Sequence, residues 1–140
     1  MKRIFLVLLA VVLAGVSTVS SFAADKPVSS KVTAYYFHGN LRCSTCHKLE
    51  QYSKEAIETN FKDALSSGKL EFKAVNVEER GNEHFAQDYQ LYTKSLVISL
   101  VKDGKEVKSK NLAKIWDYVG NKQKFYDYVT EEIKNFLKES

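Results

Sequence analysis

The chain has 140 residues, of which 44% are hydrophobic and 27% are charged, and its formal net charge is +4. This length suits one domain with a core of its own and excludes two such domains. The charges are nearly balanced and form no basic block of the kind that nucleic-acid-binding proteins carry, so we expect no nucleic-acid partner.

Residues 1–23 have the pattern of a secretory signal peptide. Lys2 and Arg3 precede an apolar run over residues 4–16, and small residues lie just before Ala23. The run is short for a membrane span of about 20 apolar residues, so we expect cleavage after Ala23. The chain is therefore expected to be periplasmic or secreted in a bacterium. Membrane contact would require an uncleaved signal or a membrane-bound electron donor.

Residues 24–31 are expected to form a short tether, and residues 32–140 one domain. Residues 31–38 are rich in β-branched and aromatic side chains and predict a buried strand, which Gly39 ends. Apolar side chains at steps of three and four then predict one long helix over residues 43–66.

The second half of the domain contains three further strands and two helices. Apolar alternation predicts a strand over residues 69–77, and Asn82 is expected to cap a short helix that carries Phe85 and Tyr89. Asp103-Gly104 is a hairpin signal between two strands. The remaining elements are expected at residues 95–101, 106–112 and 123–138.

The predicted order is β-α-β-α-β-β-α, an α/β fold with a mixed four-stranded sheet flanked by helices. Cys43 and Cys46 form a Cys-x-x-Cys motif where the first strand meets the first helix. Two strands joined by a helix form a right-handed parallel unit, and the hairpin adds an antiparallel pair. This arrangement resembles that of thioredoxin.

The spacing of Cys43 and Cys46 favours a redox-active dithiol. A disulfide that closes so short a loop removes little entropy from the unfolded chain and stabilises poorly. The start of a helix favours a thiolate, and Arg42 adds a cation, so both are expected to lower the pKa of Cys43. We therefore expect Cys43 to attack a disulfide, Cys46 to resolve the mixed disulfide, and a redox protein to be the partner, with no cofactor.

Two alternative functions would use the same two cysteines. Cys43 and Cys46 with His38 or His47 would suit copper or zinc. The motif also reads Cys-x-x-Cys-His, the attachment sequence of c-type haem, with His47 as axial ligand. Met1 is the only methionine, so a sixth ligand would have to be a histidine, and haem is the less favoured alternative.

Several short motifs along the chain are characteristic of one family. They are Tyr35 to Asn40, Arg42-Cys43-x-Thr45-Cys46 with Glu50, Asn76-Val77-Glu78, Tyr89-Gln90-Leu91, Ser95-Leu96-Val97, Asp103-Gly104-Lys105 and Trp116. With these motifs the chain resembles the nitrophenyl compound nitroreductase subunit ArsF family, which are exported thioredoxin-like proteins of bacteria. The resemblance covers nearly all of the chain after the signal peptide. It implies a component of a multi-protein system that acts on nitroaromatic compounds, including nitrophenyl arsenicals.

The chain departs from ordinary thioredoxins at three positions. The cis-proline of the substrate loop falls at Leu96 after Ser95, so this bond is either trans or held cis at a cost of about 3 kcal/mol. Phe37 stands where thioredoxins have a buried acid, and Arg42 replaces the preceding tryptophan. These departures favour a dedicated partner over general disulfide reduction.

Three further side chains are candidates for proton transfer or for tuning the thiolate. His38 ends the first strand and His47 follows Cys46 directly. Glu50 lies one helical turn after Cys46, where it would either carry a proton or pair with Lys54.

Overall fold

The computed structural model describes residues 29–140, so the expected signal peptide and most of the expected tether lie outside the described residues. The first strand begins at Ser30, which places the end of the expected tether in the sheet. Within residues 29–140, no helix combines the length and the apolar character needed to cross a bilayer.

The predicted order of strands and long helices is confirmed. The elements are β1 (Ser30–His38), α1 (Ser44–Asn60), α2 (Lys62–Ser66), β2 (Leu70–Asn76), α3 (His84–Asp88), β3 (Ser95–Lys102), β4 (Lys105–Asn111), α4 (Ile115–Tyr118) and α5 (Lys122–Lys138). The four strands form one sheet in the order β2-β1-β3-β4, with β1 parallel to β2 and the other two pairs antiparallel. The chain thus has the expected thioredoxin-like α/β fold.

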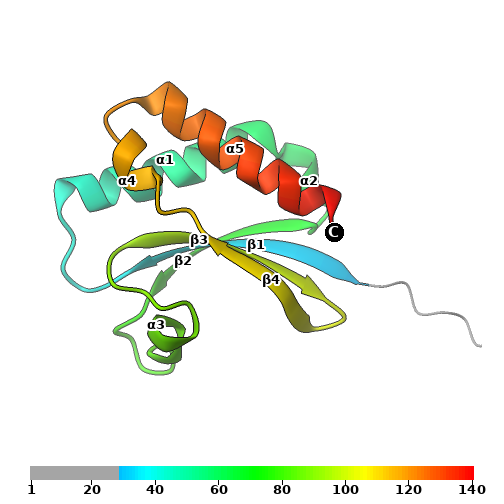
Figure 1. Cartoon of the computed structure of the whole chain (residues 1–140), viewed down its shortest axis with the longest axis horizontal. Helices are drawn as coiled ribbons and strands as arrows, with labels where there is room; N and C mark the ends of the chain where they lie inside the picture. The colour runs from blue at the N-terminus through cyan, green and yellow to red at the C-terminus, as the bar shows by residue number, and fades with distance from the viewer. Residues whose placement is uncertain (1–28) are drawn as a thin grey trace, which may run out of the picture.

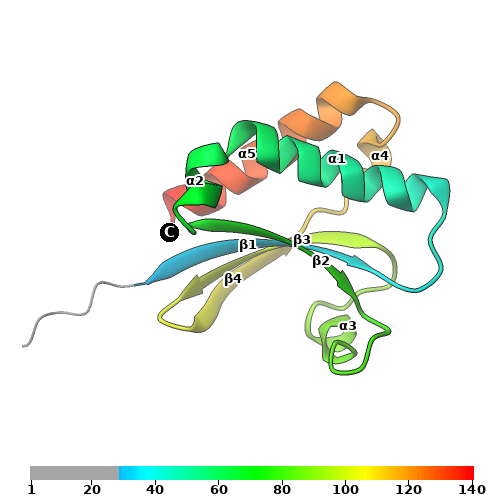
Figure 2. The ribbon, with the colours of Figure 1, turned by 180° about the vertical axis from the view of Figure 1, so that it is seen from behind.

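The helices cover the two faces of the sheet unequally. α1 and α5 lie side by side across one face, whereas α3 lies on the opposite face (Figures 1 and 2). The larger core lies beneath α1 and α5, where alternate residues of β1 and β3 meet the inner stripes of the two helices. Its fully buried members include Val32, Ala34, Tyr36, Leu49, Ile57, Leu96, Ile98, Phe125, Val129 and Ile133.

The face under α3 is closed by aromatic rings. Phe37 lies 5.2 Å from Phe85 and 5.5 Å from Tyr89, measured between ring centroids. Tyr35 stacks on Phe37 at 5.4 Å. Tyr35, Tyr36 and Phe37 therefore fill both faces of the sheet.

The single long helix predicted over residues 43–66 is wrong in its extent. Phe61 leaves helical geometry, with φ −130° and ψ 35°, and separates α1 from α2. The Asn60 side-chain amide donates to the Ala56 carbonyl at 2.8 Å and to the Thr130 hydroxyl at 3.2 Å. Such side-chain bonds compete with the helical backbone pattern at the residue just before the break.

The prediction that Asn82 caps the short helix is also wrong. The cap residue of α3 is Glu83, and its side chain makes no capping hydrogen bond. The Asn82 amide instead donates to the Asn76 carbonyl at 3.0 Å, which ties the start of this segment to the end of β2. The Asp103-Gly104 hairpin is confirmed, and both residues have positive φ, as a type I′ turn requires.

Candidate functional site

Cys43 is the N-cap residue of α1. Its backbone is extended, with φ −85° and ψ 169°, and its sulfur accepts a hydrogen bond from the Cys46 backbone N–H at 3.2 Å. Unpaired N–H groups at a helix start favour a negative charge on the capping atom. The Cys43 side chain is exposed, and both cysteines are free thiols in this structure.

The pKa of the Cys43 thiol lies below its ordinary value. The largest cause is the hydrogen bond from the Cys46 thiol, followed by the bond from the Cys46 backbone N–H. Both bonds favour the thiolate over the thiol. Cys43 is thus an exposed sulfur with a lowered pKa, which suits it to attack a disulfide.

Cys46 lies one turn into α1 and is only 3% exposed. Its backbone carbonyl accepts a hydrogen bond from the Tyr36 hydroxyl at 2.7 Å. Tyr36 is fully buried near the end of β1, and sequence reasoning assigned it only to the core. The strand alternation contained the signal, because it places Tyr36 on the same face as α1 and places Phe37 on the opposite face.

Arg42 and Glu50 form an ion pair through Nη2 and Oε2. The causes that lower the pKa of Cys43 are hydrogen bonds to its sulfur, and Arg42, which was expected to contribute, is not among them. The expected pairing of Glu50 with Lys54 is wrong, since Lys54 pairs with Glu58 at 3.8 Å instead. The Arg42 side chain therefore extends along the first turns of α1 to Glu50, which follows Cys46 by four residues.

The two candidate histidines occupy different places. His38 is half-buried at the end of β1, where its Nδ1 lies 3.1 Å from the Gly39 carbonyl oxygen and its ring centre lies 6.3 Å from that of Tyr36. His47 is exposed on α1. His38 therefore adjoins the residue that contacts Cys46.

Ser95 and Leu96 are the first two residues of β3, and both side chains are buried. Their peptide bond is trans, since residues 29–140 contain no cis peptide bond. The Leu96 carbonyl accepts the Leu112 N–H at 2.8 Å, and the Ser95 hydroxyl donates to the Thr93 carbonyl at 2.9 Å. The exposed part of this loop is therefore the segment before Ser95.

The loop between β1 and α1 is fixed by polar contacts from the end of β2. The Asn40 N–H donates to the Glu78 carboxylate at 3.0 Å. The Asn76 amide donates to the Asn40 side-chain oxygen at 2.7 Å, and its own oxygen accepts the Glu78 N–H at 3.0 Å. The Asn76-Val77-Glu78 motif, which has no evident role in the sequence alone, thus holds the loop that leads to Cys43.

Two exposed apolar side chains lie on the loops at this end of the sheet. Leu41 is 85% exposed in the loop before Cys43, and Tyr92 is 95% exposed in the loop before β3. Pairing of Phe37 with Ser95 in the sheet brings the two loops to the same edge. A cavity of about 210 Å³ lined by Tyr92, Ser95, Ile115 and Trp116 adjoins the second loop.

Within residues 29–140, no group of three or more His, Cys, Asp or Glu side chains is arranged to hold a metal ion. The described geometry thus supplies the two sulfurs of the proposed copper or zinc site without a third ligand.

No protein-family profile matches the chain, and no curated protein matches it. Among solved structures, Fasciola hepatica thioredoxin has 22% identity and a TM-score of 0.40, with 72% of this chain and 80% of that chain covered. Thioredoxin O2 of Arabidopsis thaliana in the oxidised state has 11% identity and a TM-score of 0.41, with coverage of 69% and 76%. A malarial protein has 14% identity and a TM-score of 0.39, with coverage of 66% and 96%. Because these TM-scores are low, the fold assignment rests on the chain's own strand order.

Proposed function

We propose that this chain is an exported thiol–disulfide redox protein that exchanges two electrons with a dedicated protein partner through Cys43 and Cys46. The observation that carries the proposal is the Cys43 sulfur, which caps α1, accepts the Cys46 N–H at 3.2 Å and is exposed. A solvent-facing sulfur of lowered pKa beside a buried second thiol is the arrangement that stepwise disulfide exchange requires.

When the partner is oxidised, the disulfide exchange proceeds in two steps. The Cys43 thiolate attacks one sulfur of the partner disulfide, a mixed disulfide forms, and the other partner sulfur leaves as a thiolate that takes up a proton. Cys46 then loses its proton to solvent and attacks the Cys43 sulfur. The Cys43–Cys46 disulfide forms, the bond to the partner breaks, and the partner has gained two electrons. With a reduced partner, the same steps run in reverse.

The partner is expected to contact the loops that carry Leu41 and Tyr92. Exposed large apolar side chains at one edge suit contact with an apolar segment around the partner's reactive cysteine. The buried Ser95 and Leu96 would contribute to this contact only through the backbone.

The test is to trap the partner. A Cys46→Ser variant keeps the attacking sulfur and lacks the resolving one, so it should accumulate a mixed disulfide that a reductant releases. Cys43→Ser is the matched control and should accumulate none. Equal trapping by both variants would contradict the assignment of Cys43 as the attacking sulfur.

Export rests on the pattern of residues 1–23. The expected result is a purified periplasmic or secreted chain whose mass corresponds to a start at Ala24. Retention of Met1 in material from the cytoplasm would contradict export.

The resemblance to the ArsF family supports reduction of nitroaromatic or arsenical compounds as the system that this chain serves. The trapped partner should then belong to a complex that reduces a nitrophenyl compound, and Cys43→Ser should stop that reduction in cells. Unchanged reduction with Cys43→Ser would contradict this assignment and leave the dithiol chemistry intact.

A further inference from the structure

The Tyr36 hydroxyl connects the centre of the sheet to the resolving cysteine. Tyr36 is fully buried, and its hydroxyl donates to the Cys46 carbonyl at 2.7 Å. No other hydrogen-bond partner is present for this hydroxyl among the described residues. A buried donor of this kind is costly to leave unpaired, so the bond persists as long as the first turn of α1 stays in place.

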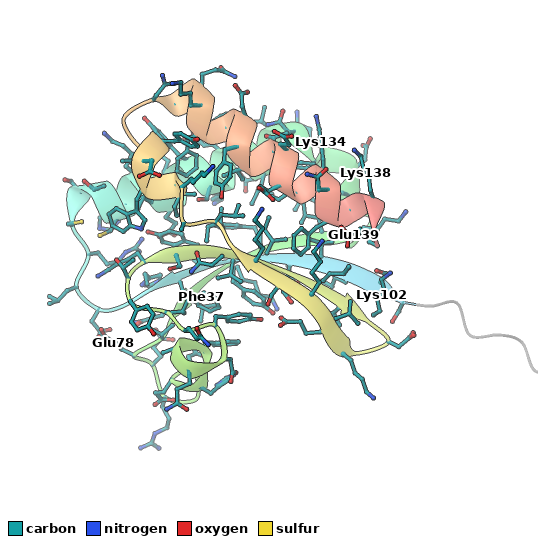
Figure 3. All side chains as sticks on the ribbon, in the orientation of Figure 1. Phe37, Glu78, Lys102, Lys134, Lys138 and Glu139 are labelled. Carbon is teal, nitrogen blue, oxygen red and sulfur yellow. The ribbon has the colours of Figure 1, made fainter. Side chains whose placement is uncertain are left out.

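The strand register explains why this hydroxyl reaches the dithiol. Side chains alternate along β1, so Ala34 and Tyr36 face α1, whereas Tyr35 and Phe37 face α3. Figure 3 shows Phe37 on the α3 side of the sheet. Phe37, at the position expected for a buried acid, therefore lies on the face away from Cys46, and the β1 side chain that hydrogen-bonds Cys46 is the tyrosine one residue earlier.

Tyr36 also shares an electrostatic environment with the dithiol. Its pKa is raised, first by burial and then by the negative charge that Cys46 can carry, and the Arg42 guanidinium opposes this rise. The hydroxyl therefore stays protonated over the working range and remains a donor.

The second step of exchange depends on geometry more than the first. Cys43 is exposed and meets its target by diffusion, whereas Cys46 must bring its sulfur in line with the Cys43–partner bond inside a crowded helix start. The rate of such an intramolecular attack falls steeply when the attacking group spends less time in the reactive geometry. The first turn of a helix has few internal hydrogen bonds and loosens most readily.

We propose that Tyr36 is the positioning residue for Cys46, holding the first turn of α1 so that the buried sulfur can displace the partner from Cys43. This inference rests on the proposed function and adds a residue that acts only in its second step. The proton of Cys46 leaves to solvent in that step, and Tyr36 neither gains nor loses one.

The test uses the chromogenic disulfide 5,5′-dithiobis(2-nitrobenzoate) with the reduced protein. Attack by Cys43 releases one coloured thiolate at a rate that depends on reagent concentration. Attack by Cys46 then releases the second at a rate that does not. Tyr36→Phe should leave the first rate within about twofold and slow the second about tenfold, since one positioning hydrogen bond is lost.

Tyr35→Phe is the matched control, because it removes a hydroxyl from the adjacent residue on the opposite face and should change neither rate. A wild-type second rate in Tyr36→Phe would overturn the inference. Equal slowing of both rates would overturn it too, as would failure of the variant to fold, because either shows a general structural role. Failure of the proposed function is distinguishable, since the wild-type protein would then show no concentration-independent release.

Discussion

Cys43 and Cys46 have different environments within one turn of α1, and the chemistry of the dithiol depends on this difference. Cys43 caps α1 with its sulfur and accepts the Cys46 N–H, while Cys46 is almost fully buried. The thiol of Cys46 is also the largest cause of the lowered pKa of Cys43. The buried sulfur therefore activates the exposed one before it takes part in the exchange itself.

This dependence predicts the effect of removing the Cys46 thiol. Cys46→Ala should shift the pH midpoint of Cys43 alkylation by iodoacetamide upward, because the thiolate loses its strongest hydrogen bond. The wild-type rate should fall only as pH drops through the lowered pKa, below the ordinary thiol value of about 8.5. The measurement is the alkylation rate against pH.

Cys46→Ser serves as the control, because its hydroxyl can still donate to the Cys43 sulfur. Its midpoint should lie closer to the wild-type value than that of Cys46→Ala. Identical midpoints in the wild-type protein and Cys46→Ala would show that the Cys46 thiol does not activate Cys43.

At the scale of elements, the loop before Cys43 includes a close approach between Gly39 and the Glu78 side chain. A Cβ atom at Gly39 would lie closer to the Glu78 Oε1 than van der Waals contact allows. The Glu78 carboxylate also accepts the Asn40 N–H at 3.0 Å, so moving it breaks that bond. The lack of a side chain at position 39 is thus part of how β2 holds the loop.

A double-mutant cycle tests this contact. Gly39→Ala should lower the free energy of unfolding by about 1 kcal/mol, through the lost hydrogen bond. In a Glu78→Ala background the same substitution should cost much less, because no carboxylate remains to be displaced. Additive effects in urea unfolding would show that the two residues do not interact.

A second element-scale contact joins α1 to α5. Lys122 donates to the Glu55 carboxylate at 2.8 Å, and the Tyr126 hydroxyl donates to the same group. These bonds, that of Lys122 first, lower the pKa of Glu55 to about 2. A carboxyl with a lower pKa in the folded state contributes stability above its unfolded value of about 4.3, and this contribution is lost as pH falls toward the folded value.

Glu55→Gln should therefore lose less stability than the wild-type protein between about pH 4.5 and pH 2. Thermal unfolding across this range is the measurement. Glu58→Gln is the control, because Glu58 lies on the same helix and pairs with Lys54 only at 3.8 Å. Equal acid sensitivity of Glu55→Gln and the wild-type protein would contradict a role for the Glu55 contact.

Local patterns predicted most of the elements, whereas contacts between distant residues escaped them. The strand at β3 and the Asp103-Gly104 turn follow from alternation and turn chemistry, which act within a few residues. At the break beside Phe61, Asn60 contacts Thr130, which lies 70 residues away from it in the chain. The predicted pairing of Glu50 with Lys54 is wrong for a similar reason. Glu50 pairs with Arg42, which precedes the helix, whereas the prediction considered only neighbours within the helix.

The candidate site shows the same difference between local patterns and contacts between distant residues. Cys43 and Cys46 are visible from their spacing, since both belong to one turn of helix. The contribution of Tyr36 becomes visible only when the helix is placed over the sheet, because ten residues separate it from Cys46. Phe37, at the position where thioredoxins have a buried acid, lies one residue after Tyr36 and therefore on the opposite face of the strand.

At the scale of the whole molecule, the sheet brings the reactive loops together. The parallel pairing of β1 with β2 and the antiparallel pairing of β1 with β3 place the starts of α1 and β3 at one edge. α1 and α5 cover one face of the sheet, and α1 begins at this edge (Figure 1). The exposed Cys43 sulfur and the apolar side chains of Leu41 and Tyr92 therefore belong to one end of the fold.

The central claim is that Cys43 and Cys46 act as one two-electron couple. Its most direct test is equilibration of the protein with buffers of reduced and oxidised glutathione, acid quenching, alkylation of the remaining free thiols and mass spectrometry. The account predicts one transition in which both cysteines lose their free thiols together and form a Cys43–Cys46 disulfide. Glutathione added independently to each cysteine, with no Cys43–Cys46 disulfide at any ratio, would contradict it.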